Sequence, residues 1–187
     1  MEKRDGELYN FIPKKRKGQV WVETVIYTLI ALVMITAVLA YARPKLEEMQ
    51  DQALIEQSIN ILKDIDALVL SVVQGGHGNK RTLDIGIKKG VLKINSKEDQ
   101  ISFTLEGKKQ YSEPGLIIEE GNLFISTTNK GELNEVVIWR DYSGKQNISY
   151  YGEQKSKQLS KSSQSYRIII ANDGLFDDLN IVDFEVN

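Results

Sequence analysis

Residues 14–42 read KKRKGQVWVETVIYTLIALVMITAVLAYA, and the order of charge and apolarity in this segment organises the whole chain. Four consecutive bases come first: Lys14, Lys15, Arg16 and Lys17. Gly18 and Gln19 follow, and from there to Ala42 the one side chain normally charged at neutral pH is Glu23. Because about 20 apolar residues span a bilayer as a helix, the segment predicts a membrane-length helix.

The distribution of charge separates the start of the chain from its body. The 187 residues carry 24 bases and 26 acids, and six of those bases and three of those acids lie in residues 1–18. Residues 19–187 therefore hold 18 bases and 23 acids, a net charge of −5. A mildly acidic body does not favour nucleic acid as a partner. Bases placed before the apolar segment predict a cytoplasmic N-terminus, with everything after Ala42 outside.

Two interpretations of the apolar segment need no family relationship. A secretory signal peptide usually has a shorter apolar core and a cleavage site of small residues, whereas here Tyr41-Ala42-Arg43-Pro44-Lys45 follows. A plain single-span anchor explains the length of the segment. It assigns no role, however, to Gly18, Gln19 or Glu23.

The combination of these residues supports a third interpretation. The run Lys17-Gly18-Gln19-Val20-Trp21-Val22-Glu23, followed by the apolar residues 24–42, resembles the class III signal of archaeal type IV prepilins and archaellins. The resemblance covers roughly residues 14–74. It implies that a membrane prepilin peptidase cuts after Gly18 on the cytoplasmic side and leaves the apolar segment on the mature protein. Glu23 then becomes the fifth mature residue, where the family carries a glutamate.

The chemistry of the junction fits that resemblance. Glycine lacks a Cβ, so Gly18 can lie extended in a peptidase cleft, and the preceding bases are expected to hold the leader at the anionic membrane face. Cleavage would free an α-amine at Gln19 with a pKa near ~8. An acid inside a membrane costs roughly 2.5–3.5 kcal/mol at the centre and less near the interface, so Glu23 is expected to be paired or to lie among headgroups. The resemblance implies pairing with the Gln19 amine of a neighbouring subunit.

The helical pattern continues beyond the apolar segment. In residues 45–73 the apolar side chains recur at spacings of three and four, at Leu46, Met49, Ile55, Ile59, Leu62, Ile65, Val69 and Val72. Glycines at 75, 76 and 78 predict the end of this helix, which would run for 55 residues, or roughly 80 Å, from Val20. Pro44 falls inside it and predicts either a kink or a break.

The remainder of the chain has the character of strands. Nine short β-branched segments between Thr82 and Val186 are separated by turn signals such as Gly121-Asn122, Ser143-Gly144-Lys145 and Asn172-Asp173-Gly174. They predict a sandwich or a curled antiparallel sheet, with the helix over one side. Residues 152–165 are rich in serine and lysine and predict an exposed loop.

The side chains that carry chemistry are sparse. The chain has no cysteine and one histidine, His77, which is too few ligands for a zinc site. No phosphate loop or catalytic constellation appears, so neither an enzyme nor a cofactor or metal is expected. Asn147-Ile148-Ser149 is a glycosylation sequon, which makes Asn147 a candidate modification site outside the cell.

The sequence thus predicts an α+β protein in which a long N-terminal helix precedes an antiparallel β-rich head. The expected parts are a cleaved leader (1–18), a transmembrane and filament-core helix (19–74) and an extracellular head domain (79–187). The resemblance implies a structural pilin-like subunit whose partners are other pilin subunits, the prepilin peptidase, an assembly ATPase and a membrane platform protein. It also implies a single-pass membrane precursor that becomes part of a cell-surface filament. The alternative is a membrane-anchored extracellular β domain that never polymerises.

Overall fold

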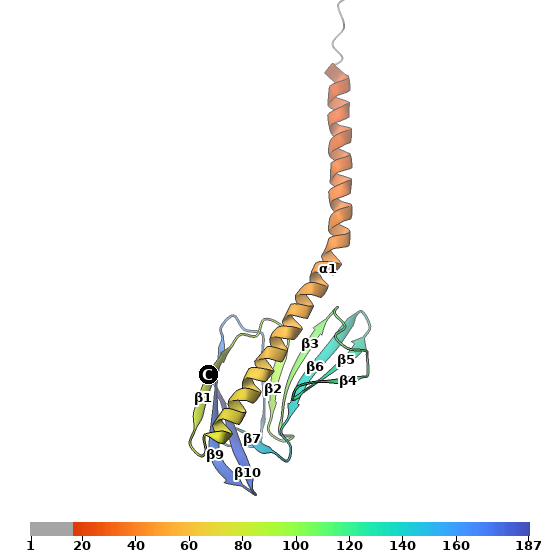
Figure 1. Cartoon of the computed structure of the whole chain (residues 1–187). Helices are drawn as coiled ribbons and strands as arrows, with labels where there is room; N and C mark the ends of the chain where they lie inside the picture. The colour runs from red at the N-terminus through yellow and green to blue at the C-terminus, as the bar shows by residue number, and fades with distance from the viewer. Residues whose placement is uncertain (1–16) are drawn as a thin grey trace, which may run out of the picture. The chain divides into compact units, whose positions relative to one another are not determined.

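The computed structural model of the chain describes residues 17–187, with side chains from Val20 onward, and shows one helix followed by ten strands (Figure 1). The predicted α+β class is therefore confirmed, with a long N-terminal helix before a β-rich head. The elements are α1 (Lys17–Gln74), β1 (Lys80–Ile85), β2 (Val91–Asn95), β3 (Gln100–Gly107), β4 (Ile117–Glu120), β5 (Leu123–Lys130), β6 (Leu133–Asp141), β7 (Gln146–Tyr150), β8 (Ser156–Ser160), β9 (Tyr166–Phe176) and β10 (Leu179–Val186).

The chain divides into two compact units at Pro44. The first unit contributes the apolar half of α1, and the second, Lys45–Asn187, contains the rest of α1 and every described strand. Pro44 lies inside α1. Because proline has no backbone N–H, it removes one hydrogen bond of the helix at the boundary between the units.

The strands of the second unit form two sheets. One has four strands in the order β1-β9-β10-β7, and the other has six in the order β4-β5-β6-β3-β2-β8. All strand pairs are antiparallel except β7 with β10, which is parallel. The antiparallel prediction is therefore wrong for this one pair, because strands distant in sequence can meet in either direction whatever their composition.

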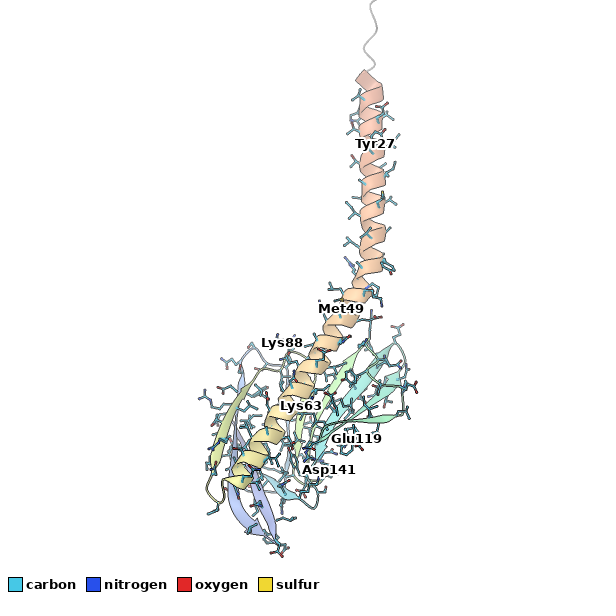
Figure 2. The ribbon with its side chains drawn as sticks, viewed as in Figure 1. Tyr27, Met49, Lys63, Lys88, Glu119 and Asp141 are labelled. Carbon is cyan, nitrogen blue, oxygen red and sulfur yellow. The ribbon has the colours of Figure 1, made fainter. Side chains whose placement is uncertain are left out.

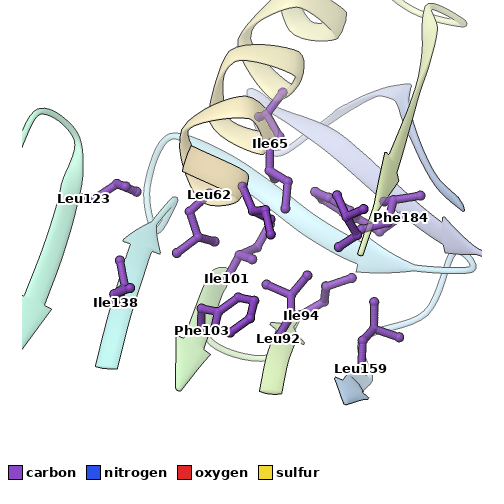
Figure 3. Packing of buried hydrophobic residues seen from close by; sticks show 14 of the residues in the cluster. Leu62, Ile65, Leu92, Ile94, Ile101, Phe103, Leu123, Ile138, Leu159 and Phe184 are labelled. Atoms are coloured by element: carbon purple, nitrogen blue, oxygen red, sulfur yellow. The ribbon is translucent and has the colours of Figure 1, made fainter. Parts of the chain in front are cut away.

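A single hydrophobic core joins the second half of α1 to both sheets. Figure 3 shows Leu62 and Ile65 of the helix above Ile101 and Phe103 of β3, with Phe184 of β10 beside them. Each of these five side chains is at most 1% exposed. The helix therefore contributes side chains to the same core as the two sheets.

The predicted helical stripe is buried only in part. Six of its members are at most 3% exposed, namely Ile55, Ile59, Leu62, Ile65, Val69 and Val72. Leu46 and Met49 are 56% and 68% exposed, so the prediction that they pack on the head is wrong. The helix contacts the core only from its third turn after Pro44, where the sheets begin to cover it.

Two local predictions are also corrected. The expected loop at 152–165 contains strand β8, whose Leu159 is 2% exposed because it pairs with Leu92 of β2. The expected turn at Asn172-Asp173-Gly174 lies within β9, and the chain reverses later, at Asp177 and Asp178, which both have positive φ. A register shift between Ile181 and Val182 accommodates the irregularity.

Candidate functional site

The first half of α1 exposes apolar side chains on every side. Trp21 is 71% exposed, Tyr27 70% and Leu32 62%, and the same holds around the whole circumference up to Tyr41 (Figure 2). This helix is long and apolar enough to cross a membrane. A helix that is hydrophobic all round is typical of a membrane span or of a helix buried among other elements.

Threonine hydroxyls in this half bond to their own helix. Thr24 donates to the Val20 carbonyl at 2.9 Å, Thr28 to the Thr24 carbonyl at 2.7 Å, and Thr36 to the Leu32 carbonyl at 2.8 Å. A hydroxyl in hydrocarbon without a hydrogen bond is costly, and these bonds remove that cost. The three threonines are therefore compatible with an apolar environment.

Glu23 lies in the second turn of α1, on an exposed position of the helix. It follows Gln19 by four residues, which corresponds to about 6 Å along the helix axis. It is the only acid of α1 before Glu47. The helix thus carries a single carboxylate close to its N-terminal end and uncharged residues from Thr24 to Ala42.

The junction before Glu23 is helical, because α1 begins at Lys17 and includes Gly18 and Gln19. The sequence predicted an extended backbone at Gly18 within a peptidase cleft. The first four N–H groups of a helix have no intrahelical partner, so this end can unwind at small cost. Lys14, Lys15 and Arg16 lie outside the described residues, and for Lys17, Gly18 and Gln19 only the backbone is described.

The head contains a buried ion pair that the sequence analysis missed. Asp66 of α1 accepts a hydrogen bond from Arg140 Nε of β6 at 2.7 Å, and both side chains are less than 10% exposed. Asn122 donates to the other Asp66 oxygen at 3.0 Å, and the Arg140 guanidinium lies 4.9 Å from the centre of the Tyr142 ring. Burial, with Asp66 nearby, raises the pKa of the Tyr142 hydroxyl far above its usual range.

A sequence signal for this pair exists. Asp66 falls between Leu62 and Val69 at the spacing of the buried stripe, where an apolar residue is expected. An acid at a core position of a helix requires a buried partner. The identity of that partner, 74 residues further along the chain, could not be read from the pattern.

A second ionic contact fixes the helix nearer to Pro44. Asp51 accepts from Lys89 Nζ at 2.6 Å and from the Lys108 backbone N–H at 2.7 Å. Partial burial alone would raise the pKa of this carboxyl, but the two hydrogen bonds outweigh it and lower the pKa below its usual value. A Cβ on Gly107 would lie 2.5 Å from the carboxylate, so a larger residue there would displace the Asp51 side chain from its present position.

The sequon lies on the edge strand β7, where two of its side-chain oxygens take part in hydrogen bonds. Asn147 is half-buried, and its Oδ1 accepts from Gln154 Nε2 at 2.7 Å. Ser149 is 3% exposed and donates to Asp183. The Asn147 amide oxygen and the Ser149 hydroxyl are thus both used within the fold.

Among the described residues no cluster of three or more His, Cys, Asp or Glu side chains could hold a metal ion. His77 packs against the irregular part of β9, where a Cβ on Gly174 would lie 3.2 Å from its Nδ1.

No family model, curated protein or solved structure matches this chain. Its function must therefore be inferred from its own residues and geometry.

Proposed function

We propose that this chain is a type IV pilin-like structural subunit, which assembles into a cell-surface filament through its N-terminal helix. The observation that carries the proposal is the apolar half of α1, exposed on all sides, on a chain whose head already has a complete core of its own. Such a helix needs partners outside the chain, and identical helices supply the same apolar surface.

The order of events follows from the charges. The bases before Gly18 retain the N-terminus in the cytoplasm while the helix enters the bilayer and the head passes outside. Prepilin peptidase then cuts between Gly18 and Gln19, after the first turn of α1 opens. The new amine at Gln19 is mostly cationic at neutral pH.

Glu23 then acts as the assembly residue. Its carboxylate pairs with the Gln19 amine of a neighbouring subunit, which satisfies both charges in an apolar filament core and sets the axial register of the incoming chain. An assembly ATPase and a membrane platform protein would extract the helix from the bilayer. The subunit performs no chemistry, and the head forms the outer surface of the filament.

The second candidate is a single-span anchored β domain that does not polymerise. The length of the apolar segment favours it, since Val25–Ala42 matches one bilayer crossing. In this case Glu23 lies among headgroups and has no partner subunit.

The mass of the N-terminal peptide of protein isolated from its own membranes tests processing directly. A chain that begins at Gln19 supports the pilin-like function. A chain that begins at Met1 in surface-exposed mature protein contradicts it and leaves the anchored domain. A start beyond Ala42 contradicts both and indicates ordinary secretion.

The variant Glu23→Ala tests assembly. It should remain inserted in the membrane and abolish filaments, measured by electron microscopy and by the protein recovered in sheared supernatants. Thr24→Ala is the matched control, because the Thr24 hydroxyl bonds to its own helix and the variant should assemble normally. Normal filament yield from Glu23→Ala would overturn the role of this carboxylate.

A further inference from the structure

Strand β4 presents an apolar free edge to solvent. It pairs with β5 on one side only and ends the six-stranded sheet. Leu116 is 53% exposed, Ile117 61% and Ile118 37%. Proteins usually protect such edges with charges, bulges or covering segments, because alternate N–H and C=O groups along them are free to pair with another strand. The exposed Glu119 labelled in Figure 2 and nearby Glu113 make this edge acidic.

The opposite edge of the same sheet is basic. Strand β8 pairs only with β2, and Ser156, Gln158 and Ser160 are exposed along it. Lys155 precedes the strand, Lys157 lies within it and Lys161 follows it. Lys155 also pairs with Glu153 at 2.9 Å, and the Lys155 and Lys157 ammonium groups lie 5.7 and 6.0 Å from the Tyr150 ring.

We propose that the head binds a second copy of this chain by sheet extension, with β4 of one copy beside β8 of the next. Charge indicates that the partner is a second copy of the chain. The acidic β4 edge and the basic β8 edge lie at the two ends of one sheet, and their charges complement each other. The five strand pairings inside this sheet are all antiparallel. Six strands of alternating direction therefore place β8 antiparallel to β4 when two copies continue the sheet in the same orientation.

The antiparallel arrangement also fits residue by residue. Ile118 and Leu159 both point to the core side of the sheet, since they lie opposite the buried Ile125 and Leu92. When Ile118 is opposite Leu159, Glu120 falls opposite Lys157. Glu120 already accepts from Lys63 Nζ at 2.6 Å and from the Tyr111 hydroxyl at 3.1 Å, so Lys157 would add a second cation to this carboxylate.

Such a contact is heterologous, since it uses two different surfaces of each copy. It leaves one free β4 and one free β8 at the ends of any assembly, so copies can be added without closure. The interface uses head residues alone. It would add contacts between heads to the helix packing of a filament, but it does not depend on peptidase processing or on the proposed pilin-like function.

Cysteine cross-linking tests the interface against a clean background, because the chain has no cysteine. The register places Glu119 opposite Gln158, both on the outer side of the sheet. Full-length E119C and Q158C are mixed in detergent micelles under mild oxidation, and should give a dimer containing one chain of each. The double variant should give a ladder of dimers, trimers and larger species.

The control pairs E119C with T82C, since Thr82 is exposed on β1, an edge of the other sheet. Cross-linking of E119C with Q158C no greater than this control would overturn the proposal, as would E119C self-dimers in equal yield. A second pair, I117C with S160C, tests the charges: adding Lys157→Glu should lower its yield roughly fivefold, whereas Lys80→Glu should not change it. The cross-linking uses unprocessed chains, so a negative result would not contradict the proposed filament function. Normal filament yield from Glu23→Ala, in turn, would not contradict this interface.

Discussion

The two halves of α1 form one continuous helix, but they differ in how their apolar residues are distributed. Residues 20–42 are apolar around the whole circumference and exposed, whereas residues 45–74 are apolar along one stripe, most of which is buried by the two sheets. Leu32 is 62% exposed and Leu62 is 1% exposed, although both are leucines of the same helix. The second half is covered by the sheets of its own chain, whereas the apolar side chains of the first half are exposed.

The charged residues follow the same division. Asp66 in the second half is buried against Arg140, with its bonds supplied by the head. Glu23 in the first half is an exposed acid on an otherwise uncharged stretch that is long enough to span a bilayer. Changing the acids of the two halves should therefore affect different properties, stability in one case and assembly in the other.

The largest effect on stability is expected from Asp66→Ala. Removing one partner of a buried pair leaves Arg140 charged and uncompensated, and should lower the free energy of unfolding by about 3–5 kcal/mol. Urea denaturation of the full chain in detergent, followed by Trp139 fluorescence in a Trp21→Phe background, measures this change. Asp84→Ala, which breaks the exposed pair with Arg167, is the control and should hardly change the free energy of unfolding, because solvent screens exposed ion pairs. Equal costs for both variants would show that the Asp66 pair is not buried in solution.

Urea denaturation of two leucine variants, one in each half of α1, tests the difference between the halves further. Leu62→Ala leaves a cavity between helix and sheets and should cost about 2–5 kcal/mol. Leu32→Ala removes the same atoms from an exposed position outside the compact unit that contains the head, so the head should unfold at the same urea concentration as the parent. A loss of head stability in Leu32→Ala would contradict the separation of the two halves.

Lowering the pH should remove the stability that Asp51 contributes to the packing of the second half of α1. The pKa of Asp51 is lowered in the fold, so its contribution is fully present above its unfolded value near ~4 and is lost as the pH falls through the lower folded value. The expected loss is roughly 1 kcal/mol, seen as a drop in the urea midpoint between neutral pH and about pH 3. Asp51→Asn should remove part of that drop. A pH dependence unchanged in this variant would assign the effect to other carboxylates.

The smallest effect is expected from Thr28→Val in the apolar half. The Thr28 hydroxyl already bonds to the Thr24 carbonyl, so exchanging it for a methyl group should hardly change membrane insertion or head stability. Extraction of membranes with carbonate measures insertion. Loss of filaments in this variant, with insertion preserved, would show that Thr28 contacts a neighbouring helix.

The elements of the head were largely predictable, because strands and tight turns leave local signals. The turns at Gly121-Asn122 and Ser143-Gly144-Lys145 separate β4 from β5 and β6 from β7 as predicted. Strand β8 was missed because its sequence is polar, and Leu159 is its one buried residue. The turn expected at Asn172 was misplaced, because the side chain of Asn172 is used inside the fold, where it bonds to the Val72 carbonyl and to Asn180.

Among the residues of the candidate sites, only those that are neighbours in sequence could be predicted. The bases, Gly18, Gln19 and Glu23 are neighbours in sequence, so their spacing could be read without a structure. The pairs Asp66 with Arg140 and Asp51 with Lys89 could not be, because they join residues 74 and 38 positions apart.

Composition and periodicity were enough to reveal a membrane-length apolar helix, its amphipathic continuation and a β-rich head. Both can be read from residues that are neighbours in the sequence. The tertiary structure alone decided that the strands divide into two sheets, that β7 pairs with β10 in parallel, and that β4 and β8 are left as opposite free edges. These outcomes depend on which distant strands meet, and alternating apolar residues satisfy many pairings equally well until the whole core is packed.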